Sequence, residues 1–75
     1  MALIIEAFRE VVGTAPDRGF RETDSMDDLG ANSMDRSEII MIVLERMNLN
    51  IPLVETFGPS NLGELARLLS EKASR

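Results

Sequence analysis

Residues 24–52 read DSMDDLGANSMDRSEIIMIVLERMNLNIP, and this stretch contains the longest helix that the sequence predicts. From Ser33 to about Met47, apolar residues recur at helical spacing. The continuous apolar run Ile39–Leu44 is wider than one helical face. Such a helix either lies in the centre of a bundle or keeps an apolar strip free for a partner or a ligand.

A β-strand over residues 39–43 is the competing prediction, because Ile and Val favour strands. The charged residues on both sides of this run suit a helix better. A single strand would also have no partner strand in this chain. The helix is therefore the preferred interpretation.

The chain beyond this helix predicts a short helical turn and then another main helix. The segment Asn48-Leu49-Asn50-Ile51-Pro52 ends the long helix, because Asn can adopt the left-handed conformation and Pro52 pushes the residue before it out of helical geometry. Residues 53–57 predict the short turn. Asn61 is a suitable N-cap for the last helix, with Glu64 three residues on as in a capping box. The amphipathic face of that helix consists of Leu62, Leu65, Ala66, Leu68 and Leu69.

An amphipathic helix of about three turns is predicted at the N-terminal side. Gly13 is a suitable residue to follow its end, and Pro16 blocks its continuation. The apolar face of this helix consists of Leu3, Ile4, Ala7, Phe8, Val11 and Val12.

Residues 14–32 show no sustained period and predict a long loop between the first two main helices. Phe20, Met26 and Leu29 are isolated apolar residues within it, and their spacing favours an ordered loop anchored to the core. The predicted fold class is all-α, in a single domain over residues 1–75. It is a small antiparallel bundle of three main helices plus one short helix, with the long loop between the first and second helices.

The composition excludes several classes of function. The 75 residues include no cysteine and no histidine, so a disulfide, a thiolate metal site and Ser-His-Asp or Cys-His catalysis are ruled out. The net charge of −5 disfavours binding to nucleic acid and to anionic membranes, and it favours partners with basic surfaces. No stretch approaches the ~18 apolar residues of a membrane span, and we expect a soluble, cytoplasmic monomer.

The tripeptide Ser-Met-Asp occurs twice, with its serine at position 25 and at position 33. Ser25 lies among acidic residues with no amphipathic helix directly after it, so we interpret it as a turn residue or a local cap. Ser33 directly precedes the longest helix, and two interpretations stay open there. It is an N-cap, since Ser and Asn are both preferred caps, worth about 1 kcal/mol. Alternatively its hydroxyl carries a phosphate, which the free N–H groups and the helix dipole would stabilise.

The acidic residues cluster around these two serines. Residues 24–38 hold five Asp or Glu and one Arg, a net charge of −4 in a fifth of the sequence. This pattern favours a docking surface that raises the association rate with a basic partner. A solvated acidic loop is the alternative interpretation.

The string DLGANSMD at residues 28–35, the helix with Glu38 after it, and Asn50-Ile51-Pro52 resemble the acyl carrier protein family. The family pattern is D-L-G-x-D-S-[LM]-[DE], a helix, then x-I-P, and the resemblance covers nearly the whole chain. It implies that a phosphopantetheinyl transferase moves 4′-phosphopantetheine from coenzyme A to Ser33. The thiol of this arm then holds an acyl group as a thioester. The resemblance also implies that the chain is not an enzyme and that partner enzymes perform the chemistry.

The resemblance implies, in addition, a docking surface on the helix after Ser33. Asn32 stands where the family usually has Asp, and Arg36 makes this helix less acidic than in fatty-acid carriers. For Met34 and Met41 a role as core filler is an equally open alternative. The residues that match the partner-facing side are Met34, Asp35, Glu38, Met41 and Glu45, and Glu55 matches the short-helix region that joins such docking.

Within the family, the residues at positions 30–36, 50–52, 57–58 and 61–65 resemble those of the free-standing carriers of polyketide β-branching. This subgroup implies loading with malonyl, decarboxylation to acetyl, and donation of acetyl to a synthase resembling 3-hydroxy-3-methylglutaryl synthase. The implied partners are therefore an acyltransferase, a decarboxylase and a synthase. A general fatty-acid or aminoacyl carrier is one alternative. An unmodified helical adaptor, in which Ser33 is only a cap, is another.

Overall fold

The computed structural model describes residues 1–13 and 19–73. It contains the helices α1 (Ala2–Val12), α2 (Ser33–Arg46) and α3 (Leu62–Ala73), and the short 3₁₀ helix η1 (Leu53–Thr56). The predicted all-α fold with three main helices, one short helix and a long first connection is confirmed. Residues 39–43 are helical, so the strand alternative is wrong. The prediction that Pro16 prevents the first helix from continuing concerns a residue outside the described ones.

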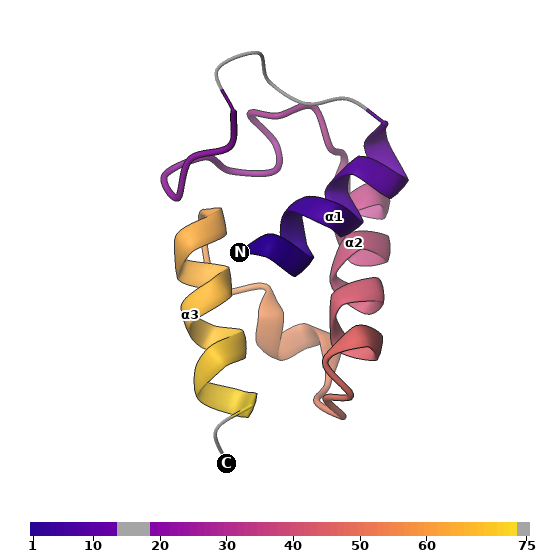
Figure 1. Cartoon of the computed structure of the whole chain (residues 1–75), viewed down its shortest axis with the longest axis vertical. Helices are drawn as coiled ribbons and strands as arrows, with labels where there is room; N and C mark the ends of the chain where they lie inside the picture. The colour runs from indigo at the N-terminus through magenta and orange to yellow at the C-terminus, as the bar shows by residue number, and fades with distance from the viewer. Residues whose placement is uncertain (14–18, 74–75) are drawn as a thin grey trace.

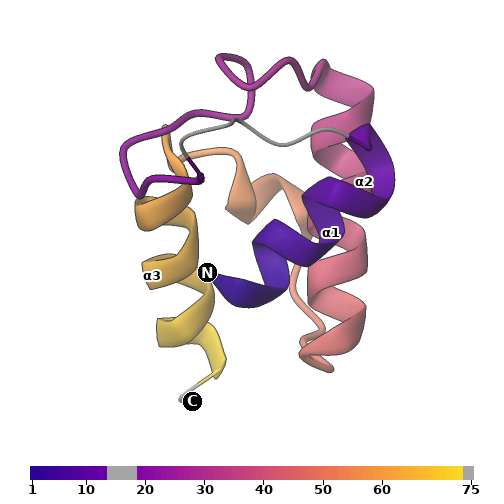
Figure 2. The same ribbon diagram turned by 45° about the horizontal axis from the view of Figure 1, so that its top comes forward.

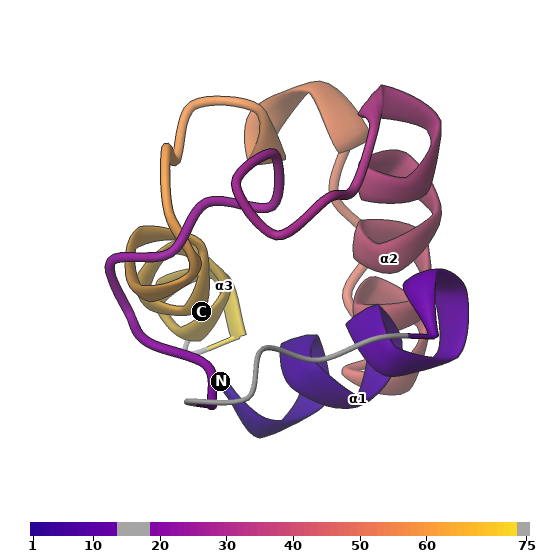
Figure 3. The same cartoon turned by 90° about the horizontal axis from the view of Figure 1, so that it is seen from above.

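The helices differ in direction. α1 begins beside α3 and crosses the molecule to α2, against the direction of α2 (Figure 1). α2 and α3 both begin at the end of the molecule where the loop of residues 19–32 lies, and they run the same way (Figures 1 and 2). The connection 47–61, which contains η1, crosses from α2 to α3 (Figure 3) and returns the chain to the end where α2 begins (Figures 1 and 2). The antiparallel relation therefore concerns α1.

The predicted helix ends have the expected left-handed residues. Gly13 has φ 80° after α1, and its N–H donates to the Arg9 carbonyl at 3.0 Å. Asn48 has φ 55° after α2. The Leu49 N–H donates to the Leu44 carbonyl at 2.9 Å, and the Asn48 N–H donates to the Glu45 carbonyl at 3.1 Å. This is a Schellman motif, which satisfies the last carbonyls of the helix.

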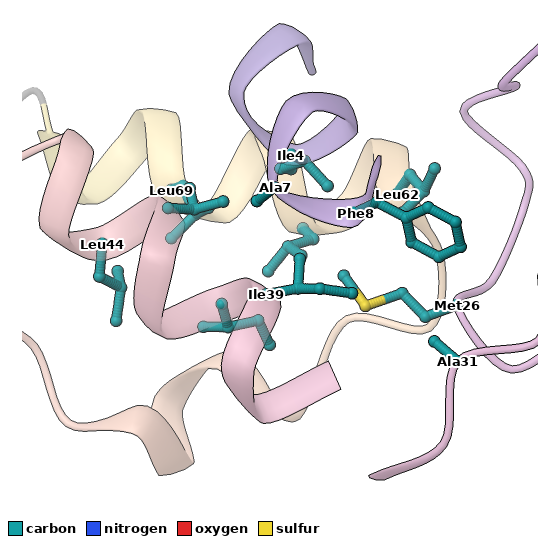
Figure 4. Packing of buried hydrophobic residues seen from close by; sticks show 12 residues of the cluster. Ile4, Ala7, Phe8, Met26, Ala31, Ile39, Leu44, Leu62 and Leu69 are labelled. Atoms are coloured by element: carbon teal, nitrogen blue, oxygen red, sulfur yellow. The ribbon is translucent and has the colours of Figure 1, made fainter. Parts of the chain in front are cut away.

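The core collects side chains from the three α helices and from the long loop (Figure 4). α2 turns one side inward while Met41 stays 60 % exposed. The apolar run of α2 therefore leaves a free strip, which decides between the two interpretations of its excess width. The buried apolar residues are Ile4, Ala7, Phe8, Met26, Ala31, Ile39, Ile40, Val43, Leu44, Leu62, Leu65 and Leu69.

The described part of the long loop is anchored as its spaced apolar residues predict. The Phe20 ring meets the Phe8 ring edge to face, with centroids 5.4 Å apart, and Met26 is buried. The loop also caps α3 through its backbone. The Leu62 N–H donates to the carbonyl of Asp24, and the Gly63 N–H donates to the carbonyl of Glu22, both at 2.8 Å. These bonds satisfy N–H groups of the first turn, which have no acceptor within the helix.

Replacing Gly63 with Ala is expected to destabilise the fold. A Cβ at position 63 would lie 2.9 Å from Glu22 Cβ and 3.1 Å from the Glu22 carbonyl oxygen. The loop would have to move, at a net cost of roughly 1–2 kcal/mol in the free energy of unfolding. Urea unfolding measures this. Gly58→Ala is the matched control, since nothing lies within 4 Å of a Cβ there. A gain in stability for Gly63→Ala, as helix propensity alone predicts, would contradict the close contact.

Candidate functional site

Ser33 lies at the first position of α2 and is exposed. The chain reaches it through a tight turn, in which Gly30 has φ 92° and the Ala31 N–H donates to the Met26 carbonyl at 2.9 Å. Ala31 is buried at 3 % exposure, and this fixes the chain just before the helix. The turn therefore holds Ser33 at a fixed point on the surface.

The N-cap of α2 is Asn32. Its Oδ1 accepts the Asp35 N–H at 2.8 Å, and a carboxylate oxygen of Asp35 accepts the Asn32 N–H at 3.3 Å. The two residues form a complete capping box. The capping interpretation of Ser33 is therefore wrong. The spacing Asn32-x-x-Asp35 carried this signal in the sequence.

The Ser33 hydroxyl is therefore not used as a cap of α2. Within residues 1–13 and 19–73 it makes no hydrogen bond to another group. The N–H groups of Ser33 and Met34 also find no acceptor in this part of the chain, because only the Asp35 N–H is taken by the cap. A phosphate on the Ser33 oxygen would meet two free donors and the positive end of the helix dipole.

Ser25 has the local role expected of it. Its hydroxyl oxygen accepts the Asp28 N–H at 3.1 Å within a turn. Its neighbour Met26 is buried, and Asp24 is buried with its carboxylate accepting the Arg21 N–H at 2.8 Å. The prediction of a turn residue or local cap is confirmed.

An open groove runs along α2 from Ser33. Met34 is 80 % exposed and Met41 60 %, so the core-filler alternative for these two residues is wrong. Glu38 and Glu45 are exposed beside them. We call this surface the α2 groove; it is lined by Ser33, Met34, Ser37, Glu38, Met41, Ile42, Leu44, Glu45 and Leu49. Four of the six predicted docking residues therefore lie together with Ser33, as a pair of methionines flanked by carboxylates.

The other two predicted docking residues do not line this groove. Asp35 is half-buried and belongs to the capping box. Glu55 pairs with Lys72, with 3.1 Å between carboxylate oxygen and Nζ, and so joins η1 to α3. Both carboxylates therefore already have a partner within the fold.

Arg36 has a role that the sequence did not reveal. Its Nη2 donates to the Pro59 carbonyl at 3.2 Å and to the Phe57 carbonyl at 3.4 Å. Its Cζ lies 5.8 Å from the centroid of the Phe57 ring, a cation–π distance. This side chain thus binds the start of α2 to the connection between η1 and α3. No local spacing could have indicated it, because the acceptors lie 21 and 23 residues away.

The N-terminus of α3 carries an acidic group with a perturbed titration. The Asn61 side chain accepts the Glu64 N–H at 2.8 Å, as predicted, but the Glu64 carboxylate accepts from the hydroxyl and the N–H of Ser60. In a capping box the Glu64 carboxylate would accept the Asn61 N–H, but here it accepts the Ser60 N–H instead. The Ser60 hydroxyl, with help from the Ser60 N–H, lowers the pKa of Glu64.

Glu64→Gln is expected to lower stability at neutral pH and to lose this effect in acid. A pKa that is lower in the folded state than in the unfolded state stabilises the fold above the unfolded pKa, and this contribution disappears as pH falls through the folded pKa. Urea unfolding of both proteins at a series of pH values measures the difference. A difference that stays constant down to the acid end would contradict a role for the ionised carboxylate.

None of the helices in residues 1–13 and 19–73 combines the length and apolar character that crossing a membrane requires.

Comparison with known proteins gives three kinds of match. A family described as phosphopantetheine attachment site matches residues 2–69. The polyketide biosynthesis acyl-carrier-protein AcpK of Bacillus subtilis is 41% identical over 70 residues, which cover 93% of this chain and 85% of the relative. An acyl carrier protein of Bdellovibrio bacteriovorus is 33% identical over 63 residues, covering 84% of this chain and 81% of the relative.

Among solved structures, the chain resembles one from the crystal structure of the curacin biosynthetic pathway HMG synthase in complex with acetyl donor-ACP. The TM-score is 0.88 and the sequence identity 42%, over 95% of this chain and 91% of that chain.

Proposed function

The chain belongs to the family of acyl carrier proteins with a phosphopantetheine attachment site, and we propose that Ser33 is the residue that receives this group. The observation that carries the proposal is the exposed Ser33 hydroxyl at the first position of α2, which has no hydrogen-bond partner among the described residues, while Asn32 takes the capping role. Ser25 is the alternative serine in the same tripeptide, and its hydroxyl is engaged in a local turn.

The residues around Ser33 fit a phosphopantetheine group. The N–H groups of Ser33 and Met34 and the helix dipole favour the phosphate, and the exposed position leaves the arm in solvent. When bound, the arm supplies the thiol that holds an acyl group as a thioester, a group that a chain without cysteine lacks. The protein itself contributes a rigid attachment point and a surface for recognition.

We propose further that partner enzymes dock on the α2 groove. Met34 and Met41 give them an adaptable apolar contact, and the exposed Glu38 and Glu45 attract basic residues around their active-site entrances. Asp35 and Glu55 also belong to the docking proposal, but as residues beside the groove, since each is engaged within the fold.

The proposed pathway is polyketide biosynthesis, with acetyl donated to a synthase that resembles 3-hydroxy-3-methylglutaryl synthase. The similarity to AcpK and to the chain crystallised with an HMG synthase supports this. The implied partners are a phosphopantetheinyl transferase, an acyltransferase, a decarboxylase and the synthase. In this proposal the chain is a cytoplasmic monomer without catalytic activity of its own.

Two assays test the proposal in sequence. Intact mass after incubation with coenzyme A and a broadly specific transferase should show one phosphopantetheine adduct, and its absence would leave the unmodified adaptor as the function. Loading with malonyl, acetyl, fatty-acyl and aminoacyl groups, followed by incubation with a β-branching synthase, should show transfer of acetyl. A chain that is loaded but does not donate acetyl would instead favour a general fatty-acid or aminoacyl carrier.

A further inference from the structure

The start of α2 faces the connection between η1 and α3, and Arg36 occupies the gap between them. Arg36 follows Ser33 by three residues, about one helical turn. Its guanidinium bonds the carbonyls of Phe57 and Pro59 and lies against the Phe57 ring. A positive charge thus joins α2, about one turn after the attachment point, to this connection.

Arg36 also lines a small cleft of about 40 Å³. Met26, Leu62 and Leu65 line it together with Arg36, and these three residues belong to the buried core. The cleft therefore leads from Arg36, one helical turn after Ser33, to residues of the core. Its volume holds only a few water molecules, far less than an acyl chain of eight carbons.

An aliphatic chain entering here would have to displace the guanidinium. The carbonyls of Phe57 and Pro59 would then lose their charged donor, and the chain would replace it with groups that cannot hydrogen-bond. A two-carbon acyl group gains too little from burial to offset this. A longer chain gains more with each methylene, so the barrier matters most for long acyl groups.

We propose that Arg36 closes the bundle to the acyl group, so that the carrier displays short acyl groups outside its core. The inference rests on the proposed function, in which Ser33 carries the phosphopantetheine arm. It assigns to Arg36 a role in selecting the acyl class, in addition to joining α2 to the connection.

A second, wider cleft of about 400 Å³ lies between α1, the end of α2 and α3. Met1, Val43, Met47 and Leu69 contribute to its lining. Met47 follows Ser33 by fourteen residues, about 21 Å along the helix. This cleft is the competing location for a long acyl chain, and the experiment has to distinguish it from the Arg36 cleft.

The five methionines of the chain distinguish these locations. Met26 lines the Arg36 cleft, Met34 and Met41 line the α2 groove, and Met1 and Met47 line the wider cleft. Protein labelled with ¹³C at the methionine methyls is loaded on Ser33 with either an acetyl or an octanoyl arm, using the acyl-coenzyme A and a transferase. Methyl spectra of the two forms are then compared.

For the wild-type chain we expect Met26, Met1 and Met47 to have the same shifts in both forms. Changes confined to Met34 and Met41 support the inference, because the chain then lies on the outside. A change at Met26 on octanoyl loading overturns the closure, and a change at Met1 or Met47 overturns the display of the acyl group outside the bundle.

In Arg36→Ala we expect the Met26 methyl signal to differ between the octanoyl and acetyl forms. The octanoyl thioester of this variant should also react with hydroxylamine about tenfold more slowly than that of the wild type, as burial of about two methylenes predicts. The acetyl form should react at the wild-type rate. A general loosening of the fold would change both forms alike, so the dependence on chain length isolates the role of Arg36. Unchanged Met26 in the variant overturns the assignment to this residue.

Arg46→Ala is the matched control, since Arg46 lies at the other end of α2 and pairs with Glu10. In this variant, the Met26 methyl shift should be the same in the acetyl and octanoyl forms, and the hydroxylamine rate of each form should equal that of the wild type. If Arg36→Ala fails to fold, Arg36→Gln, which removes the charge but keeps a polar side chain, should give the same Met26 shift. Failure of both acyl groups to load on Ser33 would refute the proposed function itself, whereas loading with a shifted wild-type Met26 refutes only the closure.

Discussion

Ser33→Ala is expected to abolish the phosphopantetheine adduct completely, whereas Ser25→Ala is expected to leave it unchanged. The two serines have the same following residues, Met and Asp, so the tripeptide alone does not distinguish them. Their environments do. The Ser33 hydroxyl is exposed at a helix start without a partner in the described chain, while the Ser25 hydroxyl accepts a backbone N–H. Intact mass after incubation with coenzyme A and transferase measures both variants.

The Ser33→Ala variant should keep the wild-type fold. Because the Ser33 hydroxyl makes no bond among the described residues, its loss should change the free energy of unfolding by less than about 0.5 kcal/mol. Asn32→Ala is the complementary control. It removes the cap and should cost about 1 kcal/mol, yet it leaves the hydroxyl for modification. An adduct on Ser33→Ala, or its loss in Ser25→Ala with the fold intact, would contradict the assignment.

Reversing the charge at Glu38 or Glu45 to Lys is expected to lower kcat/KM with partner enzymes by about tenfold at low salt, mostly through the association rate. Both carboxylates line the α2 groove, and neither forms an ion pair or side-chain hydrogen bond within the described residues. The effect should shrink as added salt screens the charges. Kinetics of transferase and synthase at several salt concentrations measure it.

Controls separate docking from stability. Glu6→Lys makes the same change in net charge at an exposed position of α1, outside the groove, and should leave partner kinetics near the wild-type values. Asp35→Lys removes half of the capping box and should lower both stability and partner use. Equal losses in Glu6→Lys and Glu38→Lys would mean that only overall charge matters, and unchanged kinetics in Glu38→Lys and Glu45→Lys would refute the docking role of the groove.

Much of the fold was predictable because it depends on local spacing. Apolar residues at helical intervals indicated each α helix. Gly13 and the segment 48–52 indicated helix ends, because Gly and Asn adopt left-handed conformations at low cost, and the structure shows that Asn48 does so. Phe20 and Met26 indicated an ordered loop, since isolated apolar residues in a polar stretch gain by packing on the core.

At the site, the sequence left the cap of α2 undecided between a serine and an asparagine. The reciprocal bonds of Asn32 and Asp35 decide it, and the i, i+3 spacing of these two residues is the sequence feature that corresponds to this cap. Met34 and Met41 were equally open, because helical spacing alone does not say how wide the covered face is. Packing of Ile39 and Val43 into the core turns both methionines outward.

The sequence by itself therefore determined the helices, most of their ends and the ordered loop, and it placed Ser33 rather than Ser25 at the start of the longest helix. These features depend on residues within a few positions of one another, where backbone geometry limits the possibilities. Only the tertiary structure decided that Arg36 bonds the carbonyls before α3, that Glu55 pairs with Lys72, and that loop carbonyls cap α3. Each of these contacts joins groups far apart in the chain, and their approach is set by how the helices pack.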